Sequence, residues 1–160
     1  MADPLIGLTM VAAATSQMRL GTGVCLVPEH HPIDLAKRIS SLDLYSNGRF
    51  ILGVGAGWQP EETAAMGGHF KHRWTQTKEC IEVMKKLWTE EEAEHHGEYF
   101  DFPPVRSYPK PVQKPHIPIW VGGHTRRALR RTAKYGDCWH TTRQTPEFVA
   151  NHIPYLRRQA

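Results

Sequence analysis

The stretch Arg49-Phe50-Ile51-Leu52-Gly53-Val54-Gly55-Ala56-Gly57-Trp58 begins as an apolar run typical of a buried strand and ends in a glycine-rich loop. Similar runs occur at residues 19–24, 118–123 and 136–140, and a helix-period segment follows each of them. Strands that alternate with helices predict a parallel sheet built with crossover connections. In such folds, binding sites are built at the carboxyl ends of the strands. The glycines at these ends are therefore candidate site residues, because they let the backbone approach a ligand closely.

The remaining elements follow from hydrophobic periodicity and from capping residues. We expect strands near residues 19–25, 50–55, 118–122 and 137–141, and helices near residues 4–16, 32–46, 60–66, 70–88 and 124–135, with a last helix starting at 146. A small hairpin is expected at 93–103, with residues 98–102 as one strand and a turn at His96-Gly97. Six prolines predict an extended connection without regular structure over 103–118. Pro154 is expected to kink or shorten the last helix.

The composition indicates one globular domain with its own core. The chain has 160 residues, of which 40% are hydrophobic and 22% are charged, and its net charge is +4. No apolar run approaches the ~20 residues that a membrane span requires, so we expect no membrane partner. The N-terminal residues do not have the pattern of a signal peptide. Three widely spaced cysteines, Cys25, Cys80 and Cys138, do not suggest a disulfide framework, and we expect a cytoplasmic location.

Four arginines, Arg126, Arg127, Arg130 and Arg131, lie within one predicted helix and account for much of the positive charge. Two interpretations remain open: the cluster suits an anionic ligand, or it is a solvated helix face. Nucleic acid is not expected as a partner, because no recognised binding motif accompanies the charge.

Metal and hydrolase chemistry find little support in the sequence. The ten histidines include the adjacent pairs His30-His31 and His95-His96, whose side chains point apart in a strand or helix. No His-x-x-x-His or Cys-x-x-Cys spacing occurs, so no metal site is expected. A Gly-x-Ser-x-Gly nucleophile motif is also missing. Cys25 and Cys138 are expected to be small buried residues.

Several short motifs together resemble the bacterial luciferase-like monooxygenases. They are Leu20-Gly-Thr-Gly-Val24, Pro32 to Arg38, Gly48-Arg-Phe-Ile-Leu-Gly-Val-Gly-Ala-Gly-Trp58, Pro109-Lys-Pro-Val112 and Ile119-Trp-Val-Gly-Gly123. Gly136-Asp137-Cys138-Trp139 also matches, although the family usually has Gly where Cys138 stands. The chain looks closest to the branch that uses coenzyme F-420, a 5-deazaflavin. Each motif is modest, but their order and spacing are specific.

The resemblance implies the fold class α/β, as an incomplete (β/α)₈ barrel. A complete barrel of this kind needs about 250 residues. The chain aligns with the family's third to sixth strands, so we expect residues 1–160 to form one partial barrel domain, a fragment with four parallel strands and a small inserted β-hairpin. Two strand edges, at 19–25 and 137–141, would be open to pairing with another chain. A homo-oligomer or a complementing barrel half is therefore an expected partner.

The resemblance also suggests which residues bind a cofactor, expected to be coenzyme F-420 or, alternatively, FMN. A non-prolyl cis peptide is expected between Gly23 and Val24, behind the flavin ring. Around the ring and its phosphate, the implied residues are Gly23, Val24, Gly55, Gly57, Trp58, Gly122, Gly123, His124 and Thr125. Related deazaflavin dehydrogenases have a catalytic carboxylate near the position of Trp58, and an indole cannot replace that proton donor. No catalytic residue is therefore assigned.

Two functions remain as hypotheses. The first is a flavin- or deazaflavin-dependent oxidoreductase that transfers hydride to, or oxygenates, a small organic substrate that the sequence does not specify. The second is a catalytically inactive half-barrel that self-associates through its open strand edges. The residue that often acts on substrate in this family follows a strand that this chain lacks, which favours the second hypothesis for the isolated chain.

Overall fold

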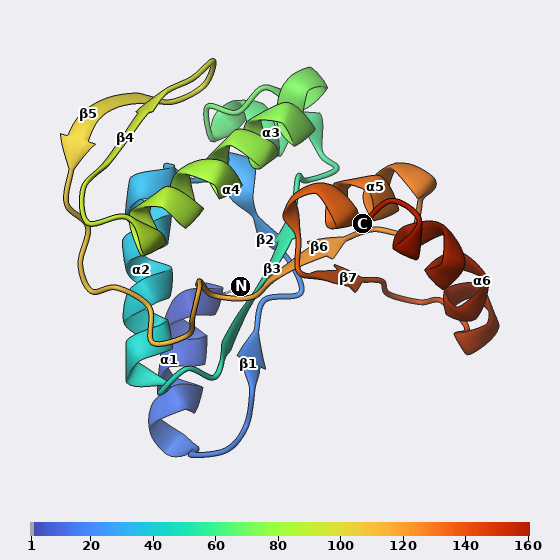
Figure 1. The fold of residues 1–160 in the computed structure, drawn as a ribbon, viewed down its shortest axis with the longest axis horizontal. Helices are drawn as coiled ribbons and strands as arrows, with labels where there is room; N and C mark the ends of the chain where they lie inside the picture. Colours follow the sequence, from blue (N-terminus) through green and yellow to red (C-terminus); the bar gives the residue numbers. More distant parts are fainter. Residues whose placement is uncertain (1) are drawn as a thin grey trace.

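The computed structural model describes residues 2–160, which form a twisted parallel sheet covered by helices (Figure 1). In chain order the elements are α1 (Pro4–Ala14), β1 (Leu20–Gly21), β2 (Cys25–Leu26), the 3₁₀ turn η1 (Val27–Glu29), α2 (Pro32–Tyr45), β3 (Phe50–Gly55), α3 (Pro60–Ala65), the 3₁₀ turn η2 (Phe70–His72), α4 (Arg73–Thr89), β4 (Ala93–His96), β5 (Asp101–Val105), β6 (Ile119–Gly122), α5 (Arg126–Tyr135), β7 (Cys138–His140) and α6 (Pro146–Arg157). The predicted order of helices and strands is confirmed.

The main sheet is parallel throughout and follows the order β1–β3–β6–β7, with β2 also paired to β3. The first expected strand, at 19–25, is two short strands, because Thr22, Gly23 and Val24 leave the ladder between them. The expected cis peptide between Gly23 and Val24 lies in this gap. The sheet therefore has five strands where four were expected. It does not close within residues 2–160, as expected for a partial barrel, and β1 and β7 lie at its two ends.

The helices pack in chain order along the sheet, with α1 against α2, α2 against α4, α4 against α5, and α5 against α6 (Figure 1). The central strand β3 is buried along its whole length, and its residues form the core together with the apolar faces of α2 and α4. Local signals explain two of the helix ends. The Asp3 side chain accepts a hydrogen bond from the Ile6 backbone N–H at the start of α1. After α2, Asn47 and Gly48 have positive φ angles.

The hairpin differs from the prediction in its register. Its second strand is Asp101–Val105, where residues 98–102 were expected, and the turn spans Gly97 to Phe100, closed by a hydrogen bond from the Gly97 N–H to the Phe100 carbonyl. Pro103 and Pro104 therefore lie in a strand, although residues from 103 onward were expected to be irregular. A two-stranded hairpin permits this, because one proline can turn its missing N–H away from the partner strand and the ladder is irregular between Ala93 and His95, opposite the two prolines.

The last helix also departs from the prediction. It continues through Pro154 to Arg157, so of the expected kink or shortening the shortening does not occur. Pro154 has no N–H for the carbonyl of Ala150, so α6 loses one intrahelical hydrogen bond and nevertheless continues past the proline. No helix within the described residues is both long and apolar enough to cross a membrane.

Candidate cofactor site

A cavity of about 260 Å³ lies where the carboxyl ends of β2, β3, β6 and β7 meet. Of the predicted site residues, those that line it are Gly23, Val24, Gly55, Gly57, Trp58, Gly122 and Gly123. They come from three chain segments that lie far apart in the sequence, and the parallel sheet brings them to one cavity. His124 and Thr125 do not line this cavity.

Val24 fills the space that the neighbouring glycines leave free. An ideal Cβ on Gly55 would lie 2.5 Å from Cγ2 of Val24, and one on Gly122 would lie 3.1 Å from Cγ1 of the same residue. Glycine at both positions therefore lets the Val24 side chain pack against β3 and β6 at the floor of the cavity. The sequence interpretation assigned this free space to a ligand ring, whereas at Gly55 and Gly122 a side chain of the protein occupies it.

Two other glycines have backbone conformations that favour glycine. Gly57 has a φ of +75° and Gly123 a φ of +130°. The Gly123 N–H donates to the carbonyl of His140 at 3.0 Å, and the Gly123 carbonyl accepts from Nε1 of Trp139 at 2.6 Å. Both backbone groups of Gly123 are thus hydrogen bonded to residues of β7. These bonds fix the backbone of the loop before α5 without a ligand.

Thr125 is the N-cap of α5, where its hydroxyl accepts a hydrogen bond from the Ala128 N–H at 3.2 Å. His124 beside it is exposed. The first-turn N–H groups of a helix have no intrahelical acceptor, and the helix dipole makes this end partially positive. The end of α5 next to the cavity therefore favours an anionic group, through its backbone rather than through the side chains of these two residues.

The structure adds four residues to the cavity that the sequence did not single out: Leu26, Trp74, His140 and Thr142. Trp58 is 80% exposed and stands at the rim, with Trp74 from the start of α4 also lining the cavity. The Nε2 atom of His140 is buried and has no hydrogen-bond partner. This nitrogen lies 3.7 Å from the position that a Cβ on Gly23 would take. A polar residue at the end of a strand was the signal in the sequence that could have identified His140.

A carboxylate also lies close to the glycine loop. Oε1 of Glu29 is buried without a hydrogen-bond partner and lies 3.7 Å from the position of a Cβ on Gly57. Burial, and then the nearby carboxylate of Glu62, raise the pKa of Glu29. Glu29 lines a separate polar cavity on the other side of this loop, together with His30, His31 and Gln76. Within residues 2–160, no group of three or more His, Cys, Asp or Glu side chains is arranged to hold a metal ion.

Comparison with known proteins places this chain in a family. The family model for luciferase-like monooxygenases matches residues 1–160. A relative from Mycobacterium tuberculosis, the uncharacterized protein Rv0953c, is 45% identical over 141 residues, which are 88% of this chain and 50% of the relative. The oxygenase component of a flavin-dependent trigonelline monooxygenase from Acinetobacter baylyi is 36% identical over 121 residues, 74% of this chain and 33% of that protein.

The fold is shared with solved structures. The coenzyme F420-dependent tetrahydromethanopterin reductase from Methanopyrus kandleri superposes with a TM-score of 0.85 at 22% identity, over 99% of this chain and 49% of that chain. This chain thus spans about half the length, or less, of the relatives it matches.

Proposed function

Since this chain belongs to the luciferase-like monooxygenase family, we propose that its cavity holds the ring of a deazaflavin or flavin cofactor and that the chain is part of an oxidoreductase acting on a small organic molecule. One observation carries the proposal: Val24, immediately before β2, and Gly55 and Gly122, at the carboxyl ends of β3 and β6, line one cavity. We further propose that residues 1–160 form one partial barrel domain with coenzyme F-420 as its cofactor and FMN as the alternative.

The cavity fits a flat ring better than a whole cofactor. Its volume of about 260 Å³ is slightly below the ~300 Å³ at which pockets for drug-sized ligands begin. Val24 would support the ring from the floor, and Trp58 and Trp74 would exclude water from its faces or edge. The unpartnered Nε2 of His140 would form a hydrogen bond with a polar atom of the ring, as donor or as acceptor according to the tautomer.

The phosphate end of the cofactor would lie at the N-terminus of α5. The N–H groups of the first turn, starting after Gly123, would bind it together with the helix dipole. When bound, the cofactor supplies the hydride or oxygen chemistry, and the protein contributes orientation, exclusion of water and electrostatics. Trp58 offers no proton at the position where related deazaflavin dehydrogenases have a carboxylate, so a proton donor from another segment is required if the reaction needs one.

A titration tests the proposal. Coenzyme F-420 and FMN are added to the purified chain, and tryptophan fluorescence is recorded because Trp58 and Trp74 line the cavity. We expect saturable quenching by one of the two cofactors. His140→Leu should weaken binding about tenfold, since one hydrogen bond to a buried group contributes about 1.5 kcal/mol. His96→Leu, a matched change at an exposed position of the hairpin outside the cavity, should leave the affinity unchanged.

The second candidate function is an inactive half-barrel that self-associates. The sheet leaves β1 and β7 at its ends, and unpaired strand edges favour pairing with another chain. Sedimentation of the same samples separates the two candidates. Oligomers or aggregates that quench with neither cofactor would favour the half-barrel and contradict the oxidoreductase, whereas a defined species with saturable binding supports the oxidoreductase.

A further inference from the structure

A second cavity, which we call the polar cavity, lies on the other side of the Gly57 loop from the cofactor site and has no part in the proposed function. Its volume is about 390 Å³. Its lining comes from η1 and the residues before α2, from the loop after α3, from α4 and from the turn of the hairpin. The polar residues that line it are Glu29, His30, His31, Gln76, Tyr99 and Asp101, and none of them lines the cofactor site.

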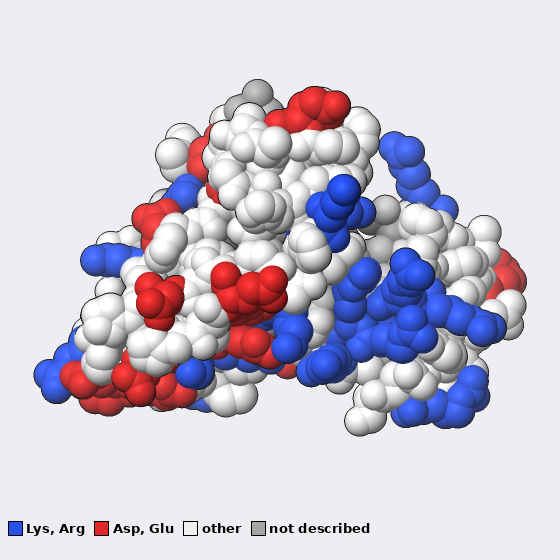
Figure 2. Space-filling model, turned by 90° about the horizontal axis from the view of Figure 1, so that it is seen from above, with Lys and Arg blue, Asp and Glu red and all other residues white. Residues whose placement is uncertain are grey.

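The lining of the polar cavity is acidic. Glu29 and Asp101 contribute carboxylates, and among the described residues no Lys or Arg lines the cavity. Burial, and then the charge of Arg38, lower the pKa of His30, so its imidazole is neutral at pH 7. Figure 2 shows a similar separation on the surface: Lys and Arg side chains gather over α5 and α6, and Asp and Glu side chains lie mostly over the other part of the molecule. A ligand with positive charge therefore suits this cavity better than an anion.

Glu29 is a carboxylate without a partner. Within residues 2–160 its side chain forms no hydrogen bond and no ion pair, and its Oε1 atom is enclosed away from water. By contrast, Asp101 pairs with Nδ1 of His96 at 2.6 Å. Burial, and then the nearby carboxylate of Glu62, raise the pKa of Glu29, as expected for a carboxylate that no cation compensates. Since buried polar groups normally have hydrogen-bond partners, the group that Glu29 lacks is a cation that donates hydrogen bonds.

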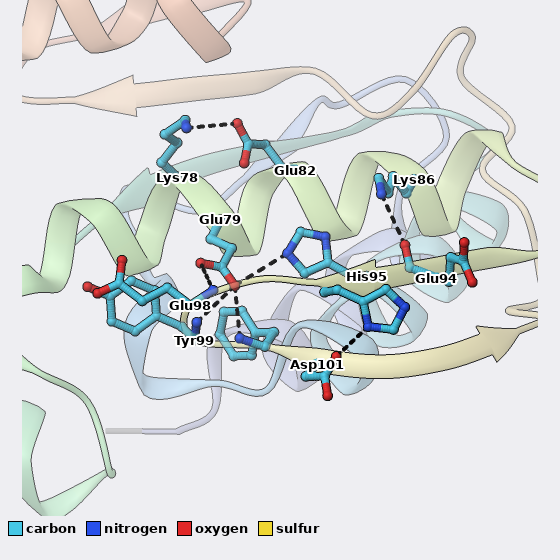
Figure 3. Close-up of polar contacts among 11 residues, drawn as sticks. Lys78, Glu79, Glu82, Lys86, Glu94, His95, Glu98, Tyr99 and Asp101 are labelled. Atoms are coloured by element: carbon cyan, nitrogen blue, oxygen red, sulfur yellow. Dashed lines mark hydrogen bonds and ion pairs between the residues drawn. The ribbon is translucent and has the colours of Figure 1, made fainter.

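Other groups around the cavity are held in place by the protein. Oε1 of Gln76 accepts a hydrogen bond from the His69 N–H at 3.3 Å, and its Nε2 has no protein acceptor among the described residues. Gln76 is only 7% exposed, so its amide is oriented and keeps a free donor. Glu79, one turn along α4, accepts from the backbone N–H groups of Tyr99 and Phe100 and so fixes these two residues of the wall (Figure 3). The cavity thus offers a negatively charged acceptor, an amide donor and aromatic side chains.

We propose that the polar cavity binds a small organic ammonium ion that also carries hydroxyl groups, such as an amino polyol. The ammonium group would donate to the carboxylate of Glu29, and a hydroxyl oxygen would accept from Nε2 of Gln76. The carbon chain would lie against Phe100, whose ring packs edge-on with the ring of His31 at 5.8 Å between centroids. A metal ion would leave the amide and the aromatic side chains unused, and a neutral polyol would leave the charge of Glu29 unpaired. The volume lies within the ~300–1,000 Å³ that is usual for small-molecule sites.

Titration of the full chain with a matched pair of ligands tests the proposal. The pair is glucamine, an amino polyol whose aliphatic amine is protonated at pH 7, and sorbitol, which has a hydroxyl group in place of the amine. Proton–nitrogen correlation NMR follows the backbone amides of Tyr99 and Phe100 and the side-chain amide of Gln76. We expect saturable shifts of these signals with glucamine, and at least tenfold weaker binding of sorbitol.

Glu29→Gln is the decisive variant, because it removes the charge and keeps the size of the side chain. It should weaken the binding of glucamine at least tenfold and leave the binding of sorbitol unchanged. Since it removes an unpaired buried charge, the variant should fold, and thermal unfolding verifies this. Glu61→Gln, at the exposed start of α3, is the matched control. It removes the same charge outside the cavity and should change the affinity for glucamine by less than about twofold, because exposed charges are screened by salt.

The proposal is overturned if glucamine produces no saturable shift at Tyr99, Phe100 or Gln76, or if sorbitol binds as tightly as glucamine. It is also overturned if Glu29→Gln binds glucamine as tightly as Glu61→Gln does. Mg²⁺ is added in a separate titration. If Mg²⁺ shifts the same signals at lower concentrations than glucamine does, the cavity is a metal site and the proposal is wrong. None of these measurements involves a flavin cofactor, so their outcome is independent of the proposed function.

Discussion

A Cβ on Gly55 would lie 2.5 Å from Cγ2 of Val24, so the valine beside β2 requires a residue without a side chain at position 55 of β3. This distance is shorter than van der Waals contact, and the valine cannot easily yield because its β-branched side chain has restricted rotamers. The pair lies at the floor of the cavity, and the two residues are 31 positions apart in the sequence. Their complementarity is therefore a property of the strand register between β2 and β3.

We expect Gly55→Ala to destabilise the protein by about 1–3 kcal/mol, the usual effect of extra volume in a packed site. Replacing Val24 by Ala in the same chain should recover part of this loss, because the two changes share one contact and are not additive. Urea unfolding of the two single variants and the double variant gives the coupling free energy. Gly7→Ala is a matched control: a Cβ there meets nothing within 4 Å, and the change should stabilise α1. Additive effects of the two cavity substitutions would contradict the packing argument.

Glu79 on α4 holds the turn of the hairpin (Figure 3). One carboxylate oxygen accepts from the backbone N–H groups of Tyr99 and Phe100, at 3.0 and 2.8 Å, and lies 3.3 Å from Nε2 of His95. The other oxygen accepts from the Glu98 N–H at 3.2 Å. The turn has few other polar partners, so a single buried carboxylate orders it against α4.

Glu79→Gln should therefore lower the free energy of unfolding by about 1–3 kcal/mol, because an amide nitrogen cannot accept the hydrogen bonds that one carboxylate oxygen accepts. Glu82→Gln, one turn along the same helix, is the control. Glu82 pairs with Lys78 at 3.2 Å on the surface, and exposed pairs of this kind contribute roughly 0–1 kcal/mol. Chemical denaturation at neutral pH measures both variants, and equal losses would show that Glu79 is no more important than a surface carboxylate.

The cysteines are expected to differ in reactivity. Burial raises the pKa of the Cys25 thiol to about 12, and also raises the pKa of Cys80. At pH 8 roughly one in ten thousand Cys25 side chains would be a thiolate, the reactive form. Cys138, which is only partly buried, should be modified first by a thiol reagent, and the other two only after unfolding. Mass spectrometry of the labelled peptides identifies the sites, and rapid native labelling of Cys25 would contradict its burial.

The raised pKa of Glu29 predicts a dependence of stability on pH. Since its folded pKa exceeds its ordinary value of 4.5, the folded state binds the proton more readily than the unfolded state. The contribution of this group to stability is therefore complete below about pH 4.5 and is lost as the pH rises through the folded pKa. At pH 7 the variant Glu29→Gln should unfold at a higher temperature than the original chain. Near pH 4 the unfolding temperatures of the two proteins should become equal. Glu61→Gln on the exposed start of α3 is the control. Equal unfolding temperatures at pH 7 would contradict the burial of the Glu29 charge.

The sequence by itself determined the order of helices and strands and the set of strand-end glycines, because periodicity and turn preferences are local properties of the chain. Only the tertiary structure placed Val24 in the space beside Gly55, Trp74 between the cavity and Arg131, and Glu79 under the turn of the hairpin. These relationships join residues that are neighbours in space and distant in sequence, and they depend on strand register and helix packing, which no local preference encodes.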